Sequence, residues 1–239
     1  MNLNLHLFIT FSILSFTIAH SQSTQKKNQL EFSIGCNYGA LKNLEFAPVS
    51  QYNFNGLVYI LNYKRTSKNE NLFEVQLNYL NSNLKSSKIP ELNAGYSKIG
   101  LGFSYLKLVY GNKDISLHLG LQSQSNFSDY DIANTNYTYF VFHQEFGLAS
   151  KISYQLNKKH YLSSKITIPF ILFRVTDADA IIKSFGSYQS VLWNLKYGYK
   201  LSDHFDVKAS CNFNYNRLQI PNAYRELQHQ INLGINYKF

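Results

Sequence analysis

The chain ends on Gln230-Ile231-Asn232-Leu233-Gly234-Ile235-Asn236-Tyr237-Lys238-Phe239, a stretch in which polar and apolar residues alternate without a break. In an extended strand successive side chains point to opposite faces, so the apolar residues share one face and the polar residues share the other. The stretch therefore predicts a β-strand whose two faces meet different surroundings.

An apolar segment near the start of the chain has the features of an export signal. Leu7 to Ile18 carries no charge and is shorter than the roughly 20 residues that a spanning helix needs. Ala19 and Ser21 are the small residues of a signal-peptidase site, so we expect cleavage after Ser21. A buried helix of a cytosolic protein is the alternative. We predict a signal peptide at residues 1–21, a short segment at 22–29 and one β-barrel domain at 30–239.

The composition of the chain fits a membrane barrel. Only 15% of the residues are charged and 16% are aromatic, and no second apolar stretch is long enough for a spanning helix. A closed barrel is then the way in which this chain could cross a bilayer. The net charge of +9 is spread along the sequence and not clustered, which argues against nucleic-acid binding. We expect these charges to face anionic lipid or the barrel lumen.

The body of the chain divides into ten alternating segments of the kind that form membrane strands. The alternation is most regular in Ile115 to Ser125 and in Phe205 to Asn216. The ten predicted strands are Leu30 to Tyr38, Asn55 to Lys64, Leu72 to Leu80, Tyr96 to Tyr110, Ile115 to Ser125, Tyr139 to Leu156, Tyr161 to Phe173, Tyr188 to Leu201, Phe205 to Asn216 and Gln228 to Phe239.

The connections between these segments alternate in length. Short connections follow the even strands and long ones follow the odd strands, as in outer-membrane barrels with short periplasmic turns and longer extracellular loops. An even strand number also returns both ends of the barrel to the periplasmic side. The pattern predicts an all-β fold, a transmembrane antiparallel up-and-down β-barrel of ten strands. Eight or twelve strands remain open if one hairpin is misassigned.

The polar face of these strands carries both signs of charge and is predicted to line the lumen. A small barrel is only slightly wider than its own side chains, so we expect ion pairs to fill it and disfavour a wide pore. A soluble secreted barrel with the opposite facing is the alternative. The facing is ambiguous around Leu57 to Tyr63 and at Lys107, which falls on the lipid side unless a bulge near Tyr105 switches the parity. Pro169 cannot donate to the ladder, so we expect a bulge or a strand end there. The predicted lumen charges are Glu31, Glu74, Glu145, Lys151, Lys196, Lys208 and Asp206.

The sequence contains no strong catalytic motif. It lacks a Gly-rich phosphate loop and the motifs Gly-x-Ser-x-Gly, His-Glu-x-x-His and paired Cys-x-x-Cys. Its seven histidines are dispersed along the chain. We therefore predict no enzyme, no catalytic residue, no metal site and no cofactor. Cys36 and Cys211 fall on strands separated by the last strand, roughly 10 Å apart, beyond the reach of a disulfide.

Two acidic repeats are the most notable polar cluster. Asp129 and Asp131 are predicted in one extracellular loop, and Asp177 and Asp179 in another. Two carboxylate pairs facing each other across a barrel mouth resemble the omptin proteases, although the second pair lacks the histidine of that family. Solvated loop carboxylates, able to hold a divalent cation loosely, are the ordinary interpretation.

The chain resembles small outer-membrane β-barrel proteins of Bacteroidota, including the PorT-like ones. The likeness rests on Ala19-x-Ser21, the ten alternating segments and the terminal Tyr237-Lys238-Phe239. It implies residence in the cell outer membrane, contact with its lipid, and a sorting signal at Tyr237 and Phe239 that the barrel-assembly machinery reads during insertion. No catalytic motif of a family can be carried over.

Three functional classes follow from this sequence. The first is a non-enzymatic barrel whose loops or turns bind an unknown protein partner, in assembly, secretion or a surface role. The second is a narrow channel or small-molecule carrier, and the third is an omptin-like protease that uses the loop aspartates. A β-barrel fold is compatible with all three functional classes.

Overall fold

The structure is a computed structural model that describes residues 27–49, 51–132, 138–177, 179–219 and 223–239. The predicted signal peptide and its cleavage residues, Ala19 and Ser21, lie outside the described residues. Within them, no helix is long and apolar enough to cross a membrane.

The described residues form eleven antiparallel strands and one short 3-10 helix, η1 (Pro90–Leu92). The strands are β1 (Asn28–Asn43), β2 (Tyr52–Thr66), β3 (Leu72–Lys85), β4 (Ala94–Gly111), β5 (Ile115–Ile132), β6 (Thr138–Gln155), β7 (His160–Thr176), β8 (Ala180–Ser184), β9 (Tyr188–Lys200), β10 (Phe205–Leu218) and β11 (Tyr224–Lys238).

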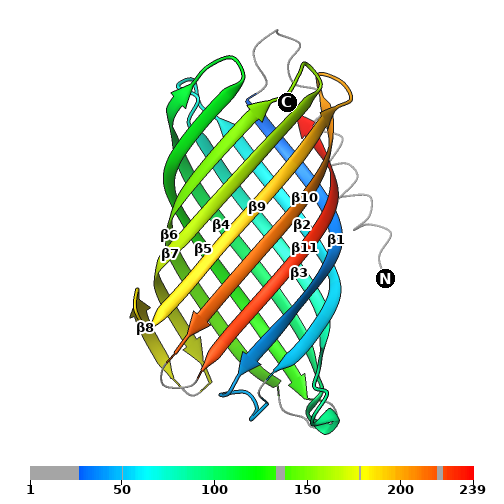
Figure 1. Ribbon diagram of the computed structural model, residues 1–239, viewed down its shortest axis with the longest axis vertical. Coiled ribbons are helices and arrows are strands. Elements are labelled where there is room, and N and C mark those ends of the chain that lie inside the picture. Colours follow the sequence, from blue (N-terminus) through cyan, green and yellow to red (C-terminus); the bar gives the residue numbers. More distant parts are fainter. Residues whose placement is uncertain (1–26, 50, 133–137, 178, 220–222) are drawn as a thin grey trace, which may run out of the picture.

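Ten of these strands close into a barrel (Figure 1). Each strand pairs with its sequence neighbour, β7 pairs with β9 past the short β8, and β11 returns to pair with β1. The closing seam begins with Leu30 opposite Tyr237. The prediction of a ten-stranded up-and-down antiparallel barrel is therefore confirmed, and the last strand removes both open edges of the sheet.

The two ends of the barrel differ. The end where β1 begins and β11 ends, at the top of Figure 1, has the short turns 67–71, 112–114, 156–159 and 201–204; we call it the terminal rim. The opposite end, the distal rim, is where β1, β3, β5, β7 and β10 end and β2, β4, β6, β9 and β11 begin. The predicted alternation of short and long connections is present only in part. The stretches 44–51, 86–93 and 177–187 are longer than the terminal-rim turns, whereas 133–137 and 219–223 are no longer than 67–71, because the strands run further than predicted.

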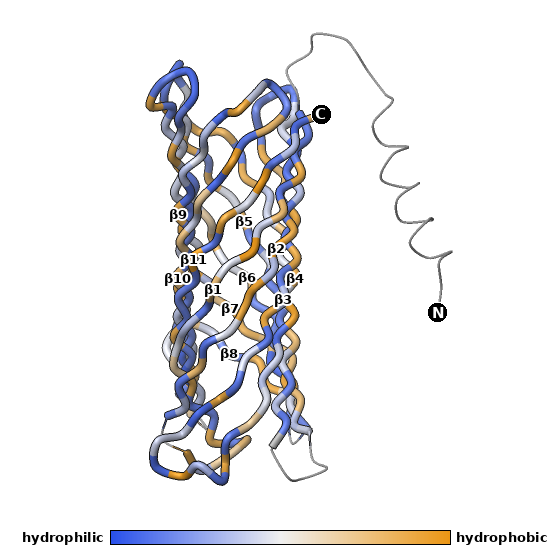
Figure 2. Tube along the Cα trace, turned by 90° about the vertical axis from the view of Figure 1, so that its right-hand side faces the viewer, coloured by the Kyte–Doolittle hydropathy of each residue, from blue (hydrophilic) through white to orange (hydrophobic). Residues whose placement is uncertain are grey.

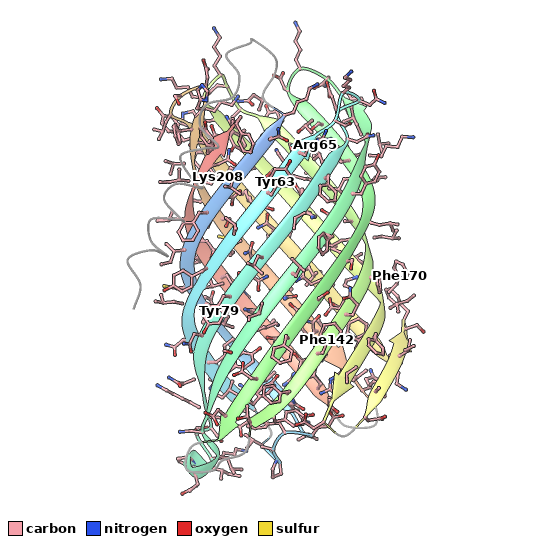
Figure 3. All side chains as sticks on the ribbon, turned by 180° about the vertical axis from the view of Figure 1, so that it is seen from behind. Tyr63, Arg65, Tyr79, Phe142, Phe170 and Lys208 are labelled. Carbon is pink, nitrogen blue, oxygen red and sulfur yellow. The ribbon has the colours of Figure 1, made fainter. Side chains whose placement is uncertain are left out.

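The strands are longer than the bilayer requires. β4, β5 and β6 each contain 18 residues, whereas a membrane strand needs about 10. On β1 to β4, outward-facing apolar residues occupy the part of the strand toward the terminal rim, whereas on β6 outward Phe140 lies near the distal end and is 43% exposed. The period-two alternation is visible along the tubes in Figure 2. On β3, for example, Tyr79 lies on the outer face (Figure 3) and is 39% exposed, whereas outward Asn81 and Asn83 follow it toward the distal rim.

Toward the distal rim the alternation inverts. On β2, Leu57 faces outward and is 49% exposed, whereas Tyr52 and Phe54 face inward and are buried, with Asn53 and Asn55 now outside. Toward the terminal rim the outside of the wall contacts lipid, so apolar side chains face outward there. Toward the distal rim the outside contacts water, so apolar side chains face the barrel interior. The facing of the second predicted strand was ambiguous because Val58 and Ile60 are apolar as well, and they face inward and are buried at 0% and 6% exposure.

Two irregularities interrupt the ladders. The β6–β7 pairing shifts between Phe146 and Gly147, opposite Pro169, which confirms the bulge expected there. The β4 ladder shifts between Leu108 and Tyr110, beyond Lys107, which stays exposed on the outer face. The parity change considered near Tyr105 therefore does not occur.

Candidate functional site

The barrel interior is the one place where the described strands bring many charged side chains together. Three layers follow one another from the terminal rim to the distal rim: an ion-pair layer, an amide chamber and an aromatic plug. Each is built from inward positions of several strands, so residues far apart in sequence meet across the lumen.

The ion-pair layer has two carboxylates, each shared by two lysines. Glu31 of β1 is 2% exposed, and its oxygens accept from Lys196 Nζ at 3.0 Å and Lys208 Nζ at 2.8 Å. Charge-assisted hydrogen bonds of this kind are strong where water is excluded. They join β1 to β9 and β10.

Glu74 of β3 is the second shared carboxylate. It pairs with Lys151 of β6 and, at 3.0 Å, with Lys165 Nζ of β7. Lys165 also donates to Ser104 Oγ at 2.8 Å. These contacts join β3 to β6 and β7 across the lumen, so the layer braces the wall from within.

A vestibule of about 680 Å³ lies between this layer and the terminal rim. Asp206 is buried at its wall, where it accepts from Lys238 Nζ at 2.6 Å and from the Tyr161 hydroxyl at 3.0 Å. Lys64 and Lys200 also line this space, so the vestibule is mainly polar, although Ile115 also contributes to its wall.

The amide chamber is smaller, at about 130 Å³. It lies on the distal side of the ion-pair layer and is lined mainly by side-chain amides, which both donate and accept hydrogen bonds. Its amide residues include Gln76, Asn78, Gln122, Gln124, Asn126, Asn194, Asn212 and Gln230.

A buried ion pair closes the distal side of the chamber. Lys98 Nζ lies 2.7 Å from Glu226 Oε2, and both side chains are at most 5% exposed. The hydroxyls of Tyr96 and Tyr224 donate to the same carboxylate at 3.0 and 2.8 Å. Glu226 is therefore fully satisfied by one cation and two phenols.

The aromatic plug fills the distal part of the lumen. The connection after β1 folds inward, so that Phe46 is 8% exposed, and its ring centroid lies 4.9 Å from that of Tyr130 and 5.9 Å from that of Tyr139. Tyr96 stacks on Tyr130 at 5.1 Å, and Val49 is buried in the same cluster. We call residues 44–49 the plug loop.

A second buried ion pair holds the plug loop in place. Arg174 of β7 is 1% exposed and donates from Nη1 to Glu45 Oε2 at 2.5 Å, and the Tyr139 hydroxyl donates to the same oxygen at 2.9 Å. Arg174 Nε also donates to His143 Nε2 at 2.9 Å. The loop is thus tied to the barrel wall by charge as well as by aromatic packing.

The predicted lumen charges all lie at inward positions of the wall. Glu31, Lys196 and Lys208 form one group, Glu74 and Lys151 belong to the other, and Asp206 faces the vestibule, while Glu145 is buried with 2% exposure. Sequence reasoning missed further partners of this network: Glu45, Lys98, Lys165, Arg174 and Glu226.

The missed residues lay where the predicted strands were cut short or their facing was unclear. Glu226 and Arg174 were assigned to loops, and the bulge at Pro169 obscured the parity of Lys165. Continuing the alternation of the tenth strand two residues toward its start would have found Glu226.

The acidic cluster does not have the geometry expected of it. Asp129 and Asp131 lie within strand β5, at positions on either side of inward, buried Tyr130, so they are on the outside of the wall and do not face across the mouth. Ser97 donates to Asp129. Asp177 accepts from the Phe140 backbone N–H at 3.4 Å, and Asp179 accepts from the Ala180 N–H at 2.7 Å within the turn after β7.

This arrangement departs from the protease resemblance. A general base must lie within about 3 Å of the proton that it takes and must face the substrate. The described residues also contain no group of three or more His, Cys, Asp or Glu side chains that could hold a metal ion.

Cys36 and Cys211 lie in one cross-strand row, with Ile231 of β11 between them. Both are free and exposed on the outer face. The strand order predicted from the sequence, with the last strand between the two cysteines, is therefore confirmed, and the two thiols do not form a disulfide.

The closed wall, the outward apolar zone and the polar, charge-filled interior together define an outer-membrane β-barrel. Such an exterior is stable against lipid, and such a closed wall leaves no strand edge unpaired within it. This architecture places the protein in an outer membrane.

No family model matches the sequence, and no curated protein matches it at a significant level. Solved barrels resemble it in shape. The translocator domain of the autotransporter NalP from Neisseria meningitidis is 10% identical, with 98% of this chain and 96% of that chain covered and a TM-score of 0.49. The transport unit of the autotransporter AIDA-I from Escherichia coli is 9% identical, with 97% of each chain covered and a TM-score of 0.49.

The β domain of the Bordetella autotransporter BrkA is 11% identical, with 89% of this chain and 100% of that chain covered and a TM-score of 0.46. At these identities the likeness does not extend to function.

Proposed function

We propose that the protein is a non-enzymatic outer-membrane barrel that does not conduct solutes and that binds a partner at its distal rim. The observation that carries this proposal is the filled lumen. The plug loop and its tyrosines occupy the distal part, and ion pairs cross the barrel on the side toward the terminal rim. A path for solutes would require both layers to be displaced.

The distal rim also has features of a binding surface. The strands continue beyond the apolar zone, so the aromatic plug forms the core of a small barrel that stands in water. The β8 hairpin projects from this end (Figure 1), and its Ile182 and Phe185 are 71% and 64% exposed. Exposed apolar groups of this size on a rigid base often mark contact sites.

The orientation belongs to the same proposal. We infer that the terminal rim faces the periplasm and the distal rim the cell exterior, because short turns and both chain ends lie on the periplasmic side in outer-membrane barrels. We also propose kinship with the small Bacteroidota barrels, PorT-like ones included, on the terminal Tyr237-Lys238-Phe239 and the ten strands.

The test has two arms. Wild-type protein in a planar bilayer should give no steady unit conductance. A photo-crosslinking amino acid at Ile182 should capture a partner in intact cells, while the same amino acid at Lys113 on the terminal rim should not capture that partner. Stable wild-type channels would overturn the non-conducting part, and capture of the same partner from both positions would overturn its assignment to the distal rim.

A narrow, gated channel is the second candidate. The vestibule and the amide chamber form polar spaces that only the ion-pair layer and the plug interrupt. In this reading the plug loop moves outward, wild-type protein shows brief openings, and Lys196→Gln or Glu74→Gln changes their ion selectivity.

A further inference from the structure

Three cations lie side by side on the outer wall near the distal rim. Lys42 of β1 is opposite Arg225 of β11, and Arg225 is opposite Arg217 of β10. The three positions alternate with buried inward neighbours, so all three side chains point away from the lumen. We call them the cation row.

Like charges directly opposite each other on adjacent strands destabilise a sheet. Directly opposite residues have Cβ atoms roughly 5 Å apart, so the row concentrates three positive charges within two strand spacings. The acidic residues of these strands, Glu31, Asp206 and Glu226, all face the lumen and cannot neutralise it. The wall as described therefore offers the row no carboxylate from its own strands.

The row also marks a boundary on the barrel. From Leu30 to Ala40 the outward positions of β1 carry no charge, and Lys42 is the next outward residue. Ten residues at about 3.3 Å each, tilted by about 40°, span about 25 Å, the height of the apolar band of an outer-membrane barrel. The row thus follows directly on the lipid-facing zone.

Aromatic rings lie two outward rows from the cations, toward the terminal rim. Tyr38 stacks on His229 with centroids 5.1 Å apart, and Phe213 lies 5.2 Å from the same imidazole. Amphipathic rings favour the interface between hydrocarbon and headgroups. They locate the cation row at the depth of the headgroups.

We propose that Lys42, Arg225 and Arg217 bind the phosphate groups of a glycolipid in the outer leaflet, whose acyl chains lie along the apolar wall of β1, β10 and β11. Arginine presents paired N–H donors that match phosphate oxygens, and lysine adds a third charge. The proposal rests on the outer-membrane placement and on the orientation inferred above, with the distal rim in the outer leaflet.

The position of the row favours a membrane lipid over a soluble anion. An apolar wall next to the cations would add no affinity for a free phosphate ion, whereas it can contact the acyl chains of a lipid. The opposite wall also lacks this pattern, since the outward residues at the distal end of β5 are Asp129 and Asp131. The proposed lipid site is therefore confined to one side of the barrel.

The experiment measures lipid binding by native mass spectrometry of the full mature protein, released from detergent micelles, with purified lipid A as the probe. The test variant is Lys42→Gln/Arg217→Gln/Arg225→Gln. The matched control, Lys68→Gln/Lys107→Gln/Lys113→Gln, removes the same charge from exposed positions toward the terminal rim. A heat-dependent gel shift checks that each variant is folded, and Arg225→Gln alone serves if the triple variant does not fold.

Wild type and control should bind lipid A equally, and the test variant roughly a hundredfold more weakly, since each cation at a membrane surface contributes to anionic lipid binding. Lipid A stripped of its phosphates should not bind to the row, and millimolar inorganic phosphate should not displace lipid A. Each of three results would overturn the proposal. The first is lipid A binding by the test variant as strong as by wild type, the second is the same loss of lipid A binding in the control variant, and the third is full displacement of lipid A by inorganic phosphate. None of these results bears on conductance or crosslinking, so the proposed function is tested separately.

Discussion

At the residue scale, the buried pairs decide how tightly the interior is held. Lys98 and Glu226 come from β4 and β11, which are not neighbours in the wall, and their contact at 2.7 Å ties opposite parts of the barrel. Breaking a buried pair by removing one partner leaves a charge without compensation.

We expect Lys98→Met to lower the free energy of unfolding by about 3 to 5 kcal/mol, because the Glu226 carboxylate then stays buried without its cation. Urea unfolding of the refolded barrel in detergent measures this. The double variant Lys98→Met/Glu226→Gln should recover much of the loss, and exposed Lys88→Met should change stability by less than about 0.5 kcal/mol. A single variant as stable as wild type would contradict the pairing.

Arg174 is predicted to hold the plug loop. On a Cys36→Ser/Cys211→Ser background, Ala47→Cys should react slowly with a membrane-impermeant maleimide, because Ala47 is 4% exposed. Adding Arg174→Met should speed labelling at least tenfold, since the Glu45 contact is lost. Arg65→Met, an exposed cation on the terminal rim, should leave the rate unchanged. Equal rates in all three proteins would mean that packing alone holds the loop.

At the scale of elements, the final strand both closes the sheet and ends the chain. Phe239 donates from its backbone N–H to the Asn28 carbonyl at 3.0 Å, and the Asn28 N–H donates to the Phe239 carbonyl at 3.1 Å. Its ring stacks on Tyr237 with centroids 5.7 Å apart. The last residue is therefore part of the closing seam.

Deleting Phe239 should reduce the amount of folded protein in the outer membrane severalfold, because the seam loses its last pair of hydrogen bonds and the predicted sorting signal loses its aromatic end. Quantitative immunoblotting of membrane fractions measures this. Phe73→Ala, which removes an outward ring from β3, is the control and should insert nearly normally. Normal levels of the deletion variant would count heavily against a role for the last residue in insertion.

The strands themselves were predicted well where lipid sets the pattern and poorly beyond it. The segment from Phe205 to Asn216 alternates in one sense and matches β10 within two residues. In β2 the outward residues change from Asn55 to Leu57, because the outside changes from water to lipid along one strand, while inward Val58 remains apolar. A search for a single apolar face therefore ends the strand too early and assigns its distal part to a loop.

At the scale of the whole molecule, the register of the closing seam can be tested by cross-linking. Ile231 lies opposite Cys36 on one side and Cys211 on the other. Directly opposite residues have Cα atoms about 4.5 to 5.5 Å apart, within disulfide range, whereas Cys36 and Cys211 are roughly 10 Å apart.

Ile231→Cys should therefore form a disulfide with Cys36 when Cys211→Ser is also present, and with Cys211 when Cys36→Ser is present. Mass spectrometry of peptides under nonreducing conditions identifies each link. Wild-type protein oxidised in parallel is the control and should show no bond between its two native cysteines. A Cys36 to Cys211 link in wild type would break the strand order.

The sequence by itself determined the barrel class, the number of wall strands and the short turns, because lipid on one side and a polar lumen on the other impose a local period of two that adjacent residues reveal. It also identified charges such as Glu31, Glu74 and Lys196 as lumen residues. Only the tertiary structure decided which of them pair, that the plug loop fills the distal lumen, and that Lys42, Arg225 and Arg217 share one row. These features depend on register and closure, which bring residues as distant as Lys98 and Glu226 together and which no local pattern records.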